Sequence, residues 1–438
     1  MDQVFTLINQ EKARQKNMIG LIPSENHVSP AVSRALGAGV LTDKCSEGYP
    51  GRRYYEGNQI IDQIENLAID RLKKLFAVPH VNVQPYSGSP ANSAVQFALL
   101  EPGDTIMGQN LFSGGHLTHG HPKVTFSGHF FNTVQYGVDD TGHIDLKAVA
   151  ALAKKHRPKL IIVGSTAYPF ILDFAGFRQI ADSVGAWLLA DISHICGLVV
   201  SGQHPSPVPY ADVIMSTTHK TFRGPRGAMI LVTQRGLDKD PTLAKRIDSA
   251  VFPALQGGPH NATIAATAVA AAEASTPAFR RYGAQIVKNA QTLAAALKKE
   301  GLQLVGDGTD NHLVVVDLSN FGVGLGKTAA VAMDAAGIYA NANTVPTEQS
   351  GAFYPSGLRL GTPLITTRGM EDTEMKKIAS WIAQAVNFAV TWGQLPDDKK
   401  ARPAFIRSAQ EEFYSAPELR HIRAEVKKMS AEFPLFAE

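Results

Sequence analysis

Short apolar runs alternate with helical stretches along much of this 438-residue chain, from about residue 81 to residue 233. Four of these runs are too short for helices and indicate buried strands, at residues 159–164, 187–191, 213–215 and 227–232. Strands that alternate with helices favour a mostly parallel sheet covered on both faces. We therefore predict an α/β domain whose ligands lie beyond the carboxyl ends of its strands.

The length of the chain is sufficient for two domains. We predict an N-terminal arm at residues 1–25, a large domain at residues 26–274 and a smaller α+β domain at residues 275–438. Beyond the second boundary, helical stretches surround a strand at residues 312–318. The expected helices of this part lie at about residues 278–300, 327–336, 370–391 and 405–430.

Composition argues against several classes of protein. A net charge of +3, dispersed along the chain, favours neither a nucleic-acid surface nor a membrane surface. The two cysteines, Cys45 and Cys196, are too few for a disulfide framework and favour a reducing compartment. The first residues lack the pattern of a signal peptide, and no apolar run is long enough to span a bilayer. We therefore predict a cytoplasmic protein without nucleic-acid or membrane partners.

A polar loop at residues 216–226, with the sequence Ser-Thr-Thr-His-Lys-Thr-Phe-Arg-Gly-Pro-Arg, joins the last two predicted strands. The amine of Lys220 can condense with an aldehyde if a dry pocket or a neighbouring cation lowers its pKa. His219, Arg223 and Arg226 are candidates for that neighbourhood. A lone loop lysine is more often a solvated charge, but its hydroxyl and basic neighbours weaken that interpretation.

Residues 217–221 and 223–227 resemble the cofactor-lysine signature of the serine hydroxymethyltransferase family, whose members are pyridoxal-phosphate enzymes. The resemblance continues in order from Leu-Ile-Pro-Ser-Glu-Asn at residues 21–26 to Gly-Leu-Arg-Leu-Gly-Thr-Pro at residues 357–363, and so covers most of the chain. It implies fold type I, with a seven-stranded sheet in the large domain, and a homodimer with shared active sites. It also implies the reversible conversion of L-serine and tetrahydrofolate to glycine and 5,10-methylenetetrahydrofolate, through a pyridoxal-phosphate aldimine on Lys220.

A helix is expected to begin near residue 89, because Ser89 is a suitable N-cap and Pro90 suits the first helical position. Such a helix start offers free N–H groups and hydroxyls to a phosphate, although an ordinary capped helix has the same pattern. The resemblance assigns this segment to the cofactor phosphate, together with glycines that approach from the other subunit. The implied phosphate ligands are Ser87, Gly88, Ser89, Gly257 and Gly258.

Asp191 follows an apolar run, at the predicted carboxyl end of a strand. A carboxylate there can keep the ring nitrogen of pyridoxal phosphate protonated, although it can also be a helix cap. The resemblance implies that His116 stacks on the ring and that His194 contacts the ring hydroxyl. The histidines at positions 116, 119 and 121 have no carboxylate or thiol at ligand spacing, so we predict no metal site.

Arg359 carries a fork of N–H donors suited to a carboxylate, although a surface salt bridge is the simpler interpretation. The resemblance implies that Arg359 and Ser24 bind the carboxylate of the amino acid. A glycine-rich loop at residues 47–55 carries a carboxylate and two phenols able to handle protons. By resemblance this loop reaches the neighbouring subunit's site, and the catalytic residues are Lys220, Glu47, Tyr55, His219 and Thr166. The implied folate contacts are Glu47, Tyr54, Leu111, Gly115, Leu117 and Asn343.

Two other functions are compatible with parts of this pattern. A folate-independent threonine-type aldolase or transaldolase needs the same cofactor residues, but the matches at Tyr54, Leu117 and Asn343 favour the folate enzyme. A binding or regulatory protein that has lost catalysis has no need for an intact Lys220 and Arg359. The chain departs from the family pattern at two places: Cys45 replaces a common tyrosine, and Ser193 replaces a common alanine.

Overall fold

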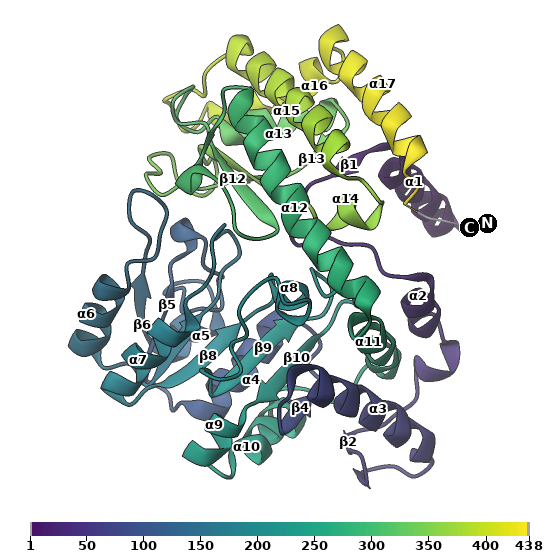
Figure 1. Ribbon diagram of the computed structural model, residues 1–438, viewed down its shortest axis with the longest axis vertical. Coiled ribbons are helices and arrows are strands. Elements are labelled where there is room, and N and C mark those ends of the chain that lie inside the picture. The colour runs from purple at the N-terminus through teal and green to yellow at the C-terminus, as the bar shows by residue number, and fades with distance from the viewer. Residues whose placement is uncertain (1, 436–438) are drawn as a thin grey trace.

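The computed structural model describes residues 2–435 and contains two bodies, each with its own sheet and hydrophobic core (Figure 1). The larger body is organised on a seven-stranded sheet. Its strands, in spatial order, are β4 (His80–Asn82), β10 (Ala228–Val232), β9 (Val213–Thr217), β8 (Trp187–Asp191), β7 (Leu160–Val163), β5 (Thr105–Gln109) and β6 (Asn132–Tyr136). The strands from β9 to β6 are parallel, whereas β10 runs antiparallel to both of its neighbours. The predicted mostly parallel sheet is therefore confirmed.

Successive side chains along each strand point to opposite faces of the sheet, and both faces are covered by helices. In β7, Ile161 joins one core and Ile162 joins another. The first face is covered by α2 (Pro30–Leu36), α3 (Gln59–Phe76), α6 (Leu146–His156), α7 (Phe174–Val184), α8 (Cys196–Val200) and α11 (Asn261–Ala274). The second face is covered by α4 (Gly88–Leu99), α5 (Phe126–Phe130), α9 (Gln234–Lys239), α10 (Leu243–Ser249) and the turn η3 (Ala250–Leu255).

The smaller body has a four-stranded antiparallel sheet and a separate core. The strands, in spatial order, are β11 (Gln303–Leu304), β12 (Leu313–Asp317), β15 (Gly357–Gly361) and β14 (Asn341–Asn343). The helices are α13 (Gly326–Ala335), α14 (Pro363–Thr367), α15 (Asp372–Trp392), α16 (Arg402–Phe413) and α17 (Pro417–Glu432). We expected one helix at residues 405–430, which was wrong. Pro417 lacks an N–H and favours an extended residue before it, so a new helix begins there.

The N-terminal segment packs on this smaller body. Helix α1 (Gln3–Asn17) lies beside α17 (Figure 1), and β1 (Ile19–Gly20) pairs in parallel with β13 (Ile338–Tyr339). Ile19 is fully buried in the core of the smaller body. Since the first and last parts of the chain share this core, the smaller body is built from segments distant in sequence.

A single long helix, α12 (Pro277–Lys299), contributes to both cores (Figure 1). Ile286, near its middle, packs in the core of the larger body, whereas Leu293, two turns later, packs in the core of the smaller one. The expected domain boundary at about residue 275 lies just before this helix. The two bodies are therefore joined by continuous packing along α12.

We predict that Ile286→Ala and Leu293→Ala each lower the free energy of unfolding by about 2–5 kcal/mol, because each leaves a cavity in a packed core. Urea unfolding followed by circular dichroism measures this change. Ile60→Ala, at an exposed position of α3, is the control and should change the free energy by less than about 0.5 kcal/mol. A change at Ile286 or Leu293 as small as that of the control would contradict the shared-core interpretation.

Candidate active site

The carboxyl ends of the parallel strands, the N-terminus of α4 and strand β15 of the smaller body surround a cavity of about 450 Å³. The structure brings most of the predicted site residues into this one cavity. Those that line it are Ser24, Ser87, Gly88, Ser89, Leu111, Gly115, His116, Leu117, Thr166, Asp191, His194, His219, Lys220 and Arg359. Residues from segments more than 300 positions apart therefore meet at the place where a parallel sheet is expected to bind its ligand.

Lys220 lies in the loop between β9 and β10 and is only 9% exposed. Burial lowers the pKa of its amine to about 8; the negative charge of Asp191 opposes this shift and the positive charge of Arg359 adds to it. Among the residues that the structure describes, no carboxylate lies within ion-pair distance of Nζ. A lysine in this environment loses its proton more readily than an exposed lysine, so a larger fraction of its amine is neutral and nucleophilic near physiological pH.

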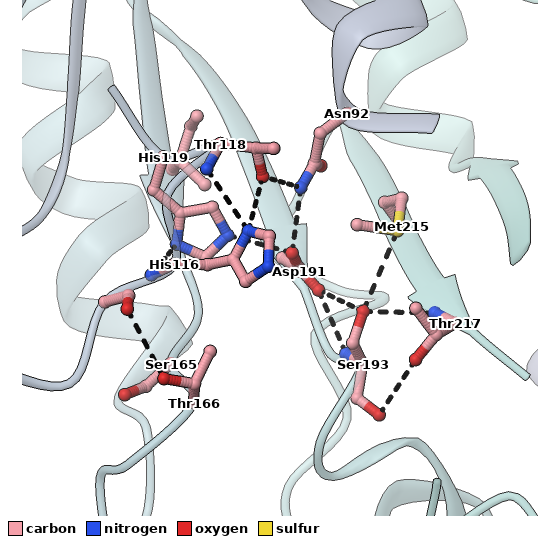
Figure 2. A network of polar contacts seen from close by, with 12 residues as sticks. Asn92, His116, Thr118, His119, Ser165, Thr166, Asp191, Ser193, Met215 and Thr217 are labelled. Atoms are coloured by element: carbon pink, nitrogen blue, oxygen red, sulfur yellow. Dashed lines mark hydrogen bonds and ion pairs between the residues drawn. The ribbon is translucent and has the colours of Figure 1, made fainter. Parts of the chain in front are cut away.

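Asp191 ends β8 at the floor of the cavity and accepts hydrogen bonds on both carboxylate oxygens (Figure 2). Nε2 of His119 lies 2.8 Å from Oδ2, and Nδ2 of Asn92 donates to the same oxygen at 3.0 Å. Burial would raise the pKa of Asp191, but the hydrogen bond and charge of His119 hold it below its ordinary value. The residue therefore stays an anion, as a partner of a protonated ring nitrogen must.

Sequence reasoning did not identify His119 and Asn92 as partners of Asp191. His119 was considered only as a metal ligand, together with His116 and His121. The structure places its ring on a carboxylate, and among residues 2–435 no group of three or more metal-binding side chains is gathered. Asn92 is a buried amide inside a helix, and because that burial is seen only in the folded chain, no local sequence pattern identified it as a partner of Asp191.

Two further histidines of the cavity are held neutral. Burial lowers the pKa of His116 to about 4, with a smaller contribution from His119, and its Nδ1 accepts from the backbone N–H of Thr118 at 3.2 Å. Burial likewise holds the pKa of His194 well below its ordinary value. Nδ1 of His194 lies 3.2 Å from Nε2 of His312, a fully buried residue of the smaller body that sequence reasoning missed. Neutral imidazoles suit the ring contacts predicted for His116 and His194.

Arg359 projects from β15 into the cavity. Its Nε donates to Oδ1 of Asn341 at 3.0 Å, and its Nη1 donates to the backbone oxygen of Thr166 at 2.5 Å. Burial lowers the pKa of the guanidinium to about 10, so it remains a cation at neutral pH. The group is therefore oriented by both bodies of the molecule, and Nη2 stays available for an anion.

The N-terminus of α4 offers free donors to the cavity. The helix begins at Gly88 with Ser87 at its N-cap, so the predicted N-cap at Ser89 was wrong. Ser87 has an extended backbone, and Pro90 is accommodated because N–H groups of the first turn need no partner within the helix. The hydroxyl of Ser87 makes no capping bond, and a Cβ on Gly88 would lie 2.7 Å from Cγ2 of Thr217. Only a glycine fits this close approach.

Six predicted residues lie outside the cavity of their own chain. Tyr54 and Tyr55 are 69% and 51% exposed on the loop that follows the hairpin of β2 (Gly48–Tyr49) and β3 (Arg52–Arg53). Oε2 of Glu47 is buried without a hydrogen-bond partner, and a Cβ on Gly258 would lie 3.1 Å from Cδ of Glu47. The residues outside are Glu47, Tyr54, Tyr55, Gly257, Gly258 and Asn343. Asn343 lines a small neighbouring crevice beside Phe112.

The residues of the cavity fit pyridoxal phosphate. A buried amine with a lowered pKa, a carboxylate held ionised and free donors at a helix N-terminus match its aldehyde, ring nitrogen and phosphate. The donors come from separate elements but converge on one cavity. This convergence is more specific than any single feature, each of which occurs in many proteins.

Comparison with known proteins identifies the family of this chain. A family model described as serine hydroxymethyltransferase matches residues 1–382. The chain belongs to the serine hydroxymethyltransferase family. It is 54% identical over 432 residues to a serine hydroxymethyltransferase of Acidothermus cellulolyticus, covering 98% of this chain and 95% of that one. Identity is 55% over 385 residues to that of Desulfotalea psychrophila, covering 88% of both chains. It is 56% over 389 residues to that of Sorangium cellulosum, covering 88% of this chain and 90% of that one.

Membership of the serine hydroxymethyltransferase family confirms fold type I, and the structure contains the expected seven-stranded sheet. Enzymes of this family use pyridoxal phosphate and take tetrahydrofolate as co-substrate. The folate-independent aldolase is not supported by these findings. Within residues 2–435, no helix combines the length and apolarity needed to cross a membrane.

We predict that Lys220→Met stabilises the cofactor-free protein at pH 7 by up to about 3 kcal/mol, because the pKa of Lys220 falls from 10.5 to about 8 on folding. Below pH 8 the folded chain carries the full cost of the buried charge. Between pH 8 and 10.5 the unfolded chain binds more protons, so the stability of the wild type rises and the advantage of methionine fades.

Urea unfolding of the wild type and of Lys220→Met between pH 7 and 10.5 measures this difference. Lys245→Met, at an exposed lysine, is the matched control and should show no such trend. A stability difference that stays constant with pH would mean that Lys220 is not a buried charge.

Proposed function

We propose that this chain transfers the hydroxymethyl carbon of L-serine to tetrahydrofolate, giving glycine, 5,10-methylenetetrahydrofolate and water, and that it also catalyses the reverse reaction. The observation that carries the proposal is the buried amine of Lys220, which shares one cavity with the carboxylate of Asp191 and the guanidinium of Arg359. An amine, an anion and an oriented cation are the groups that an aldehyde cofactor and an amino acid require.

The cofactor would be held at three points. Lys220 takes its aldehyde, Asp191 its ring nitrogen, and the first turn of α4 its phosphate, with Ser87, Gly88 and Ser89 as donors. When bound, pyridoxal phosphate accepts the electron pair that the Cα–Cβ bond of serine releases as it breaks. The neutral ring of His116 lines the same cavity and suits stacking on a flat aromatic group.

Arg359 binds the carboxylate of serine, together with Ser24, which lines the same cavity. Its Nε and Nη1 are already bonded to Asn341 and Thr166, so the guanidinium is oriented before the substrate arrives. A preorganised guanidinium loses little conformational entropy when the substrate binds, and this favours tight binding of the α-carboxylate. The Cα–Cβ bond is thereby fixed relative to the floor of the cavity.

We assign His219 to the catalytic group because it lines the same cavity as the Lys220 amine. Burial lowers the pKa of His219 to about 3, so the ring is neutral, and its buried Nδ1 has no hydrogen-bond partner. The hydroxyl of Thr166 donates to the backbone oxygen of Gly114 at 3.0 Å and fixes the loop that orients Arg359. In this proposal His219 offers a neutral ring nitrogen to the groups around Lys220, whereas Thr166 positions Arg359.

Glu47 and Tyr55 supply the remaining proton transfers from a second copy of the chain, so we propose a homodimer with shared active sites. Support comes from their position: neither lines the cavity of its own chain, Tyr55 is exposed, and Oε2 of Glu47 has no partner. Gly258 adjoins Glu47 and Gly257 precedes it in the chain, so both would approach the phosphate from the same side. Tyr54 and Asn343 would complete the folate site at the rim formed by Leu111, Gly115 and Leu117.

One assay tests the reaction directly: serine turnover by the cofactor-loaded protein, with and without tetrahydrofolate. Glycine formation that requires tetrahydrofolate supports the proposal, whereas equal turnover without it would favour an aldolase. We also place the protein in the cytoplasm, because Cys45 and Cys196 are both free thiols.

We predict that Arg359→Ala raises the KM for serine about ten- to a hundredfold, because hydrogen bonds to a charged group contribute about 1.5–3 kcal/mol. The KM for tetrahydrofolate should stay within about twofold, since Arg359 is directed at the amino acid. Steady-state kinetics with each substrate varied in turn measures both constants. An unchanged KM for serine would remove Arg359 from the carboxylate role.

We predict that two inactive variants complement each other when they are expressed together. A dimer of one Lys220→Ala chain and one Glu47→Gln chain contains one site with native Lys220 and native Glu47, so it should recover about half of the wild-type activity. Differently tagged chains allow the mixed dimer to be purified and assayed. Activity no greater than the sum of the two parents would show that the sites are not shared.

A further inference from the structure

The carboxylate of Asp191 is surrounded by donors from its own chain (Figure 2). Oδ2 accepts a hydrogen bond from Asn92 and lies within hydrogen-bond distance of His119. Oδ1 accepts two hydrogen bonds from Ser193, one from its backbone N–H at 3.0 Å and one from its hydroxyl at 2.6 Å. A carboxylate has about four acceptor positions, and the protein fills most of them. The orientation of this side chain, which is only 7% exposed, is therefore determined before any ligand binds.

Ser193 differs from the other donors because its hydroxyl also accepts a hydrogen bond. The backbone N–H of Thr217, at the end of β9, donates to Oγ of Ser193 at 3.0 Å. Thr217 in turn packs against the first residue of α4, where a Cβ on Gly88 would lie 2.7 Å from Cγ2. One hydroxyl thus connects Asp191 with Thr217 (Figure 2), and Thr217 in turn contacts the first residue of α4.

We propose that Ser193 is a positioning residue whose hydroxyl holds the carboxylate of Asp191 in one orientation and in register with the N-terminus of α4. The proposal rests on the cofactor site described above, in which Asp191 takes the ring nitrogen and α4 takes the phosphate. The ring nitrogen and the phosphate belong to one rigid ligand. Asp191 and the N-terminus of α4 must therefore be aligned with each other as well as with the ligand.

Removing the hydroxyl breaks both connections at once. In Ser193→Ala the backbone N–H still reaches Oδ1, but the carboxylate loses its shortest hydrogen bond and the buried N–H of Thr217 loses its acceptor. The remaining hydrogen bonds, from Asn92 and His119 on Oδ2 and from one backbone N–H on Oδ1, then hold the carboxylate less firmly. Burial raises the pKa of Asp191, whereas His119 and Lys220 lower it. The hydrogen bond from Ser193 also lowers this pKa, by a smaller amount.

The test compares wild type, Ser193→Ala, Ser193→Cys and the control Ser201→Ala. Ser201 is a buried serine of the same body whose hydroxyl donates to the backbone oxygen of Leu198, away from the cavity. Cofactor-free protein is titrated with pyridoxal phosphate, and protein fluorescence gives the dissociation constant. The visible circular dichroism at saturation reports how asymmetrically the bound cofactor is held.

We expect Ser193→Ala to raise the dissociation constant about three- to tenfold and to weaken the visible circular dichroism per bound cofactor, which corresponds to one or two lost hydrogen bonds. Ser193→Cys should lie between alanine and wild type, because a thiol is a weaker donor. Ser201→Ala should match wild type in both measurements. This pattern would separate a positioning role from a general loss of stability.

A dissociation constant within twofold of wild type for Ser193→Ala, with unchanged circular dichroism, would overturn the proposal. An equal effect in Ser201→Ala would overturn it too. If Ser193→Ala fails to fold, Ser193→Cys decides alone, and wild-type values for it would also overturn the proposal. A wild-type protein that binds no pyridoxal phosphate would overturn the cofactor site itself, whereas normal binding in every variant would overturn only the role of Ser193.

Discussion

The site depends on a cation that the fold keeps out of water. The amine of Lys220 is buried beside two other positive charges, Arg359 and Arg226, and only the charge of Asp191 opposes their effect. A charge taken from water without a paired partner is costly, so the folded chain favours the neutral amine that a nucleophile requires. The surrounding cores of two bodies supply the stability that makes this environment possible.

The topology of the larger sheet explains why the groups meet. Parallel strands end at one edge, so Asp191 at the end of β8 lies beside Met215 of β9, two residues before Thr217 ends that strand, although a helix and a loop separate them in sequence. Arg359 then comes from a different body and is fixed by a backbone oxygen of the first. The cavity is therefore a property of the junction between the two bodies, and neither body contains it alone.

The sequence was most informative where chemistry and local structure coincide. Asp191 lies at the end of an apolar run and Lys220 lies in the polar loop that follows another, and these positions indicated a ligand-binding edge. His119, Asn92 and His312 were missed because their roles depend on contacts with residues 72, 99 and 118 positions away. No local pattern encodes such distances.

Two other limits of the sequence have physical causes. The start of α4 was displaced by two residues because Ser87 and Ser89 are equally good caps by composition, and the backbone of Ser87 decides between them. The position of Glu47 could be inferred only through resemblance. Glu47 does not line the cavity of its own chain, so one chain alone does not bring it to the other predicted site residues.

The long helix α12 has a mechanical consequence. Because Ile286 belongs to one core and Leu293 to the other, the junction along this helix contains packed side chains where many two-domain enzymes have a flexible linker. Movement of the smaller body toward the cavity must therefore occur by shear, in small sliding steps between interlocked side chains, and a wide swing about a hinge is disfavoured. The place of Arg359 relative to the floor of the cavity therefore depends on packing along a helix that does not line the cavity.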